Sequence, residues 1–199
     1  MKKILTSTPQ TKKTLFILLT ISLFFITTVI FASVTNVKPI HNKDYFQKVH
    51  SLLLQAKKSI YMIMFEIRYY HKYPNSPANR LVRDLMQAAK RGVDVEVILE
   101  QAKEFNEKNS KANKEVGVML TSAGIKVYLD SPYQTTHNKL ILVDGIYTVV
   151  GSTNWTYHGL KKNNESSVLI ESKEITNTFT KYFIRIKRTC KPLFIPNKK

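Results

Sequence analysis

The sequence predicts an α/β fold in which a mixed β-sheet is sandwiched between helices. Segments with apolar side chains at helical spacing alternate with short runs typical of strands. Late in the chain, two strand-like runs are joined by Asp144-Gly145, a dipeptide that favours a two-residue hairpin turn. Strand-helix alternation gives parallel strands with helices on both faces, and a hairpin adds an antiparallel pair. The predicted sheet is therefore mixed.

Four helices follow from the spacing of apolar residues and from end signals. Ser76 is a typical N-cap, Pro77 suits a first helical turn, and Gly92 closes the same helix. The last helix is basic and amphipathic. The expected helices are 44–57, 76–92, about 104–124 and 173–190.

Six strands are expected between and after these helices. Val93–Leu99 shows the alternation of apolar and polar residues that is typical of a half-buried strand. No internal repeat and no second domain is visible, so residues 34–199 are expected to form one catalytic domain. The expected strands are 60–65, 93–99, 125–129, 139–143, 147–150 and 167–170.

Residues 1–33 are expected to be a signal peptide or an N-terminal membrane anchor. Four lysines precede residues 14–32, which carry no charge. Nineteen uncharged residues are long for a cleaved signal and just enough to span a bilayer, and Ile30 weakens a cleavage site at Ala32. The sequence leaves open whether this segment is cleaved or retained. In either form the domain is exported, so it is expected to be periplasmic, secreted or membrane-anchored outside the cytoplasm.

The charge of the chain predicts a polyanionic partner. The net charge is +17, and +13 remains without the four N-terminal lysines, because no acidic residue precedes position 34. Such an excess favours nucleic acid or an anionic membrane surface, although a solvated basic surface is the plainer alternative. The single cysteine, Cys190, excludes an intramolecular disulfide. No Cys/His cluster has zinc-ligand spacing, so neither metal nor cofactor is expected.

A group of polar residues on the predicted hairpin carries the chemistry. His137 and Lys139 lie two apart and so share one face of a strand, and Ser152 and Asn154 follow the returning strand with the same spacing. The hairpin brings all four to one end of the sheet. Histidine is suited to proton exchange or to phosphoryl transfer near neutral pH. Lysine, asparagine and serine are suited to holding phosphate oxygens.

These residues resemble the HKD motif of the phospholipase D superfamily. His137-x-Lys139, then Asp144, then Gly151-Ser152-x-Asn154 match every position of that motif. The order of elements is similar over about residues 40–190, most of all to the one-motif bacterial Nuc-type endonucleases and mitochondrial cardiolipin hydrolases. The resemblance implies the phospholipase D/nuclease fold and a metal-independent phosphodiesterase. It also implies that His137 is the nucleophile of a phosphohistidine intermediate.

The same resemblance assigns the remaining motif residues. It implies that Lys139, Asn154 and Ser152 bind the phosphoryl oxygens and that Asp144 supports the motif structurally. Glu165 resembles the glutamate that orients the histidine in the small members, which suits a carboxylate beside an imidazole. The alternative for Glu165 is an ordinary solvated residue at the start of a strand.

One motif per chain predicts an assembly of two chains. Cleavage through a phosphohistidine needs a nucleophile and a general acid. The second His-x-Lys, His41-Asn42-Lys43, has Lys48 where the aspartate is required and no Gly-Ser-x-Asn after it, so we interpret it as unrelated. A two-fold homodimer would place His137 of each subunit in one shared active site.

The sequence leaves two classes of substrate open, nucleic acid and phospholipid. The basic charge favours a non-specific endonuclease acting on DNA or RNA. The alternative is a phospholipase D that hydrolyses phosphatidyl headgroups such as phosphatidylcholine or cardiolipin, with membrane association through residues 14–32. A third hypothesis, a basic binding module without activity, is disfavoured by the intact motif.

Overall fold

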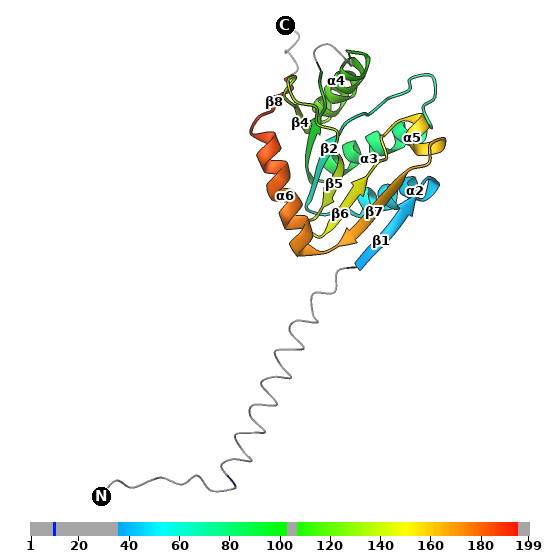
Figure 1. The fold of residues 1–199 in the computed structure, drawn as a ribbon. Helices are drawn as coiled ribbons and strands as arrows, with labels where there is room; N and C mark the ends of the chain where they lie inside the picture. Colours follow the sequence, from blue (N-terminus) through cyan, green and yellow to red (C-terminus); the bar gives the residue numbers. More distant parts are fainter. Residues whose placement is uncertain (1–9, 11–35, 103–106, 195–199) are drawn as a thin grey trace, which may run out of the picture. The chain divides into compact units, whose positions relative to one another are not determined.

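A computed structural model describes residues 10, 36–102 and 107–194, and the chain divides after Thr35. The described part of the second unit contains one eight-stranded sheet in the order β1-β7-β6-β5-β2-β3-β4-β8 (Figure 1). β2, β3 and β4 run parallel, and the other neighbours pair antiparallel. The strands are β1 (Asn36–His41), β2 (Ser59–Met64), β3 (Asp94–Leu99), β4 (Lys126–Leu129), β5 (Lys139–Val143), β6 (Tyr147–Gly151), β7 (Ser166–Glu171) and β8 (Lys191–Pro192).

Helices cover both faces of the sheet, as the sequence predicts. The helices of the described region are α2 (Lys43–Gln55), α3 (Pro77–Lys90), α4 (Glu107–Ser122), α5 (Tyr157–Lys161) and α6 (Lys173–Lys187). α6 lies on one side of the sheet, and α2 and α3 lie on the other (Figure 1). The predicted mixed sheet between helices is therefore confirmed.

The pleat of the strands separates two apolar clusters. Along β5, Ile141 and Val143 pack in the cluster shared with α2, α3 and α4. Leu140 and Leu142 point the other way, into a smaller cluster closed by Phe183 of α6. Lys139 lies two residues before Ile141 on β5, so its side chain leaves the strand on the same face of the sheet.

Local signals explain where the helices and turns begin. Ser76 caps α3, because its side chain accepts a hydrogen bond from the Asn79 amide at 3.3 Å, and Pro77 follows it in the first turn. In the hairpin between β5 and β6, Asp144 and Gly145 have φ angles of 56° and 69°. Two positive φ values at these positions are what a two-residue hairpin turn requires, so the predicted turn is confirmed.

Three short elements were not predicted. β1 contains Pro39 and lies at the edge of the sheet, where a residue without an N–H is tolerated. α5 and β8 have five and two residues, too few for a periodic pattern. The beginning of the predicted helix at about Glu104 lies outside the described residues, which resume at α4.

The predicted signal or anchor at residues 14–32 also lies outside the described residues. Within the ranges that are described, no helix is both long and apolar enough to cross a membrane.

Candidate active site

Apart from Asp144, the motif residues lie at one end of three neighbouring strands. β5 begins at Lys139, β6 ends at Gly151 and β7 begins at Ser166. The pairing of Leu140 with Val150, and the 3.0 Å bond from the Ser152 amide to the Ser166 carbonyl, bring these three ends side by side. The hairpin therefore places the two halves of the motif together, as the spacing predicts.

Lys139 and His137 form the centre of this site. The Lys139 Nζ lies 3.2 Å from each ring nitrogen of His137 and donates to its carbonyl at 3.0 Å. The Phe65 ring lies beneath both residues, 4.3 Å from the imidazole centroid and 4.6 Å from the Nζ. Lys139 is only 5% exposed, whereas His137 reaches solvent. A substrate therefore meets the imidazole first, with the ammonium group behind it.

The surroundings of the pair favour a neutral imidazole. Burial lowers the pKa of His137, and the charge of Lys139 lowers it further. Burial also lowers the pKa of Lys139, although the nearby charges of Glu165, Glu66 and Glu100 oppose this effect. Near neutral pH the imidazole is unprotonated, which is the form in which it can attack an electrophile.

Ser152 and Glu165 form a hydrogen-bonded cluster beside this centre. The Ser152 hydroxyl donates to the Glu165 carboxylate and accepts from the Ser166 amide at 3.0 Å. The other carboxylate oxygen accepts from the Asn163 amide group at 2.8 Å. Glu165 is thus occupied by Ser152 and Asn163, and its charge acts on Lys139. Its role in orienting His137 stays a prediction.

Asn154 presents a polar atom that has no partner inside the described chain. Its Oδ1 is buried without a hydrogen bond to any described residue. An unpaired buried acceptor costs free energy until a donor satisfies it, and rotation of the amide presents N–H donors at the same place. The backbone here is held closely by α5, because a Cβ at Gly159 would collide with the Asn154 carbonyl. These features are typical of a substrate-binding position.

Asp144 lies away from the other motif residues. It follows the far end of β5, so on the order of 20 Å of strand separates it from His137. Its carboxylate accepts hydrogen bonds from three successive amides at 2.7–3.1 Å, those of Lys57, Lys58 and Ser59. These bonds tie the hairpin to the start of β2. The geometry agrees with a structural role and places Asp144 outside the reacting centre.

Replacing Asp144 with alanine should destabilise the fold by about 2–3 kcal/mol, because three amides lose a charged acceptor. The backbone hydrogen bonds lower the pKa of Asp144 in spite of partial burial. This stabilisation is therefore complete above the ordinary Asp pKa of about 3.9 and disappears as the pH falls through the lower folded-state value. Urea denaturation at pH 7 and pH 3 measures both effects. The exposed Asp44, replaced in the same way, should cost less than about 1 kcal/mol.

His41 and Asn42, from the incomplete second motif, lie at the same end of the sheet. The His41 Nδ1 is 3.3 Å from the Ser166 hydroxyl, and Asn42 accepts from the Glu165 amide at 2.7 Å. β1 is three strands from β5, about 14 Å at the usual strand spacing, so His41 is too far to exchange a proton with His137 directly. Its contacts secure the start of β7.

Other contacts around the centre had no sequence signal. Asn113 of α4 is completely buried, accepts from the Ile67 amide at 3.0 Å and donates to the Phe65 carbonyl at 2.8 Å. It thereby fixes the segment that carries the ring under His137. A single asparagine in a charged helix is not distinguishable from a surface residue until the contacts are known.

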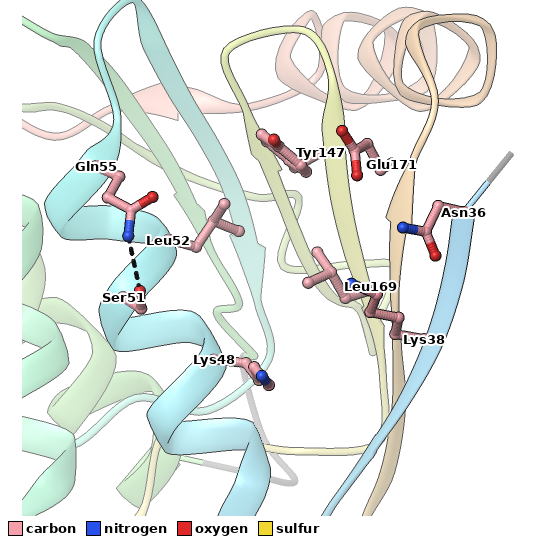
Figure 2. A pocket seen from close by; sticks show the side chains of 9 residues that line it. All are labelled: Asn36, Lys38, Lys48, Ser51, Leu52, Gln55, Tyr147, Leu169 and Glu171. Carbon is pink, nitrogen blue, oxygen red and sulfur yellow. Dashed lines mark hydrogen bonds between the residues drawn. The ribbon is translucent and has the colours of Figure 1, made fainter.

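Figure 2 shows the side chains that line a hollow at the opposite end of the strands. The volume of this hollow is about 230 Å³. Tyr147 and Glu171 contribute to its wall from the ends of β6 and β7 that are remote from the motif. None of the predicted site residues lines it. Within the described ranges, no group of three or more His, Cys, Asp or Glu side chains is arranged to hold a metal ion.

Comparison with known proteins identifies the family. The family model described as cardiolipin synthase, PLD-like domain, matches residues 49–187. Mitochondrial cardiolipin hydrolase of Xenopus tropicalis is 27% identical over 161 residues, 79% of this chain and 70% of that protein. Phospholipase D of Rickettsia bellii is 30% identical over 132 residues, 66% of this chain and 58% of that protein.

Solved structures show the same fold. Nuc, a phospholipase D family member from Salmonella typhimurium, has a TM-score of 0.67 and 23% identity, covering 81% of this chain and 99% of its own. NucT from Helicobacter pylori has a TM-score of 0.64 and 15% identity, covering 80% and 99%. Together with the family match and the complete motif, this likeness shows that the chain belongs to the phospholipase D superfamily and is a phosphodiesterase of that family.

Proposed function

We propose that the chain hydrolyses phosphodiesters through a phosphohistidine formed on His137, with nucleic acid as its substrate. The observation that carries the reaction is the contact between the buried Lys139 ammonium group and the exposed, neutral imidazole. The imidazole attacks phosphorus and the leaving oxygen departs with a proton from a general acid. Water then cleaves the phosphorus–nitrogen bond and restores the histidine.

Three groups are placed to stabilise the charge on phosphorus. A phosphoryl oxygen that arrives at His137 replaces the ring as the acceptor for the Lys139 Nζ. The Asn154 amide, whose Oδ1 lacks a partner in the described chain, supplies a donor after rotation. The Ser152 hydroxyl, now bonded to Glu165, is a further donor. Donors fixed in advance where negative charge develops are an effective source of rate enhancement.

A basic surface on the α6 side of the sheet, adjoining the motif through Asn138, supports an extended polyanionic substrate. The Asn138 side chain, between the two motif residues, donates to the Tyr182 hydroxyl of α6 at 3.0 Å. These residues border a hollow of about 470 Å³ whose rim includes the exposed cations Lys181 and Arg185. Two neighbouring cations, Lys181 and Arg185, suit a nucleic-acid backbone with several phosphates better than a single lipid headgroup. Lys187, also on α6, forms an ion pair with Glu96 at 2.6 Å.

A second surface favours the lipid alternative. Tyr70, Tyr73, Tyr157 and His158 border a largely apolar hollow of about 570 Å³, close along the chain to Asn154. Such a surface suits an acyl chain as well as a base. The relatives named cardiolipin hydrolase and phospholipase D add to this alternative.

The choice is tested with the purified chain in EDTA, supplied separately with single-stranded DNA and phosphatidylcholine vesicles. We expect DNA cleavage, and turnover of the lipid alone would contradict the nuclease proposal. Lys181→Gln combined with Arg185→Gln should raise the KM for DNA several-fold and leave hydrolysis of a small chromogenic diester unchanged. Lys173→Gln with Lys191→Gln, exposed cations elsewhere, is the matched control.

We also propose that two chains form one active site, because each chain contributes one complete motif. One imidazole would attack while the other protonates the leaving group. Specific activity should then fall when the protein is diluted below its dimer dissociation constant. Mixing His137→Ala with Lys139→Ala chains should not restore normal activity, since neither motif is intact. A monomer that stays fully active on dilution contradicts the shared site.

We propose, from sequence alone, that residues 1–33 export the domain or anchor it outside the cytoplasm. Fractionation of cells that express the full chain, with and without protease added outside, tests this proposal. A domain that is protected from external protease and found in the cytosolic fraction contradicts it.

A further inference from the structure

Two buried carboxyl groups lie side by side near the motif. Glu100 directly follows β3 and Asp130 directly follows β4. These strands are parallel neighbours that pair Leu99 with Leu129, so the two acids extend from adjacent strand ends. Each residue is only 1% exposed. Two ionised carboxylates held together away from water repel each other and lose their hydration, so this arrangement favours one proton in the pair.

The hydrogen bonds of the pair show where a proton is needed. The Asp130 Oδ1 accepts from the Gln101 amide at 2.7 Å, whereas its Oδ2 is buried without a partner among the described residues. The Glu100 Oε2 accepts from the Thr136 amide at 2.6 Å. Burial and hydrogen bonding to Asp130 raise the pKa of Glu100 to about 8. A protonated Glu100 that donates to Asp130 supplies the missing donor.

The charges around Glu100 and Asp130 favour one proton shared between the two carboxyl groups. Lys139 of β5 faces Glu100, and its charge opposes the rise in the Glu100 pKa. Cys190, in the segment after α6, faces Asp130, and burial together with the Asp130 charge raises the thiol pKa to about 11. The thiol is therefore neutral near neutral pH. Lys139 also feels the charges of Glu165 and Glu66, so it does not neutralise two ionised carboxylates of the pair.

The pair is connected to the nucleophile through the backbone. Thr136 immediately precedes His137 in the irregular segment that leads from β4 to β5. The Glu100 carboxyl holds the amide of this residue, and the same carboxyl lies within electrostatic reach of Lys139. Movement of Glu100 would therefore displace the imidazole and change the charge around the lysine.

We propose that Glu100 and Asp130 share one proton and act as positioning residues, with the protonated Glu100 fixing the Thr136 amide and hence His137. This inference rests on the proposed phosphodiesterase function, since it concerns the placement of the nucleophile. Loss of the shared proton at alkaline pH leaves two adjacent negative charges. The carboxyls then separate, the segment before His137 shifts, and turnover falls.

Carboxyl ¹³C NMR of the full chain, labelled at glutamate, tests the shared proton without any substrate. Glu100 is assigned by the signal that disappears in Glu100→Gln. We expect it to titrate near pH 8, and titration in the ordinary range, near 4.3, would overturn the proposal. Because this readout needs no turnover, it decides the shared proton even if the proposed function is wrong.

The positioning role is tested by pH profiles on a chromogenic phosphodiester. Glu100→Gln keeps an acceptor for Thr136 and a permanent donor for Asp130, so kcat at pH 7 should stay within about threefold and the alkaline decline should move up by at least one pH unit. Glu100→Ala should lower kcat at least tenfold with little change in KM. Glu96→Gln changes a buried acid within β3 that is paired with lysines, and it should leave the pH profile unchanged. A Glu100→Gln profile that superimposes on the wild type would assign the decline to Lys139 and overturn the proposal.

Discussion

Replacing His137 with alanine should abolish phosphodiester turnover, by at least about 10³-fold in kcat, while the fold is retained. The residue reaches solvent and its ring contacts Lys139 and Phe65, so truncation removes the nucleophile without opening the core. Hydrolysis of a chromogenic diester measures the loss, and circular dichroism measures the fold. His71→Ala is the matched control, because the His71 side chain is 71% exposed and pairs only with Glu115 among its described contacts of opposite charge. A His137→Ala chain within tenfold of wild type would contradict this assignment.

The same histidine sets the expected acid limit of the activity. Burial and the charge of Lys139 hold the pKa of His137 below its usual value of about 6.5. The attacking form is the neutral imidazole, so the acid limb of the activity is expected where the pH falls through this lowered value. Lys139→Met removes the cation and should shift the acid limb of any residual activity upward. A limb at or above pH 6.5 in the wild type would contradict the electrostatic picture.

The parts of the fold and of the site that could be predicted depend on residues that lie close together in the sequence. The hairpin depends on the adjacent residues Asp144 and Gly145, and its turn brings Ser152 back to the strand of Lys139. α3 is specified in the same way by Ser76 and Pro77 at its start. Periodicity and turn chemistry carry such information within about ten residues, which is why the hairpin and the strand ends that it joins could be predicted.

The supporting contacts could not be predicted because they join distant parts of the chain. Glu100 meets the Thr136 amide across 36 positions, and Asn113 meets the Phe65 carbonyl across 48. No pattern in either local sequence distinguishes these residues from solvated ones. Their roles follow only from parallel strands that end together and from a helix packed over those ends. The sequence motif thus identifies reacting groups, and the tertiary structure supplies the residues that hold them.

Asn113 is the clearest case of such support. Its Oδ1 accepts from the Ile67 amide at 3.0 Å, and its Nδ2 donates to the carbonyls of Phe65 and Glu100 at 2.8 and 2.9 Å. The side chain is completely buried. One amide group therefore connects the end of β2 to the end of β3, and it bonds the backbone of the residue whose ring contacts His137.

Replacing Asn113 with alanine should lower the free energy of unfolding by about 3–5 kcal/mol, since the Ile67 amide and the Glu100 carbonyl lose their partner and the Phe65 carbonyl loses one of two donors. Asn109→Ala is a matched control one turn earlier in α4. Asn109 is also buried and also donates to the Phe65 carbonyl, at 2.9 Å, but its Oδ1 has no partner among the described residues. Its loss should cost only about 1 kcal/mol, because the unpaired acceptor is removed as well. Urea denaturation of the two variants compares them, and kcat of the folded Asn113→Ala chain should also fall as Phe65 is released. Equal destabilisation by the two substitutions would contradict this prediction. It would mean that burial of an asparagine in α4 stabilises this end of the sheet, and that the hydrogen bonds of Asn113 to the ends of β2 and β3 do not.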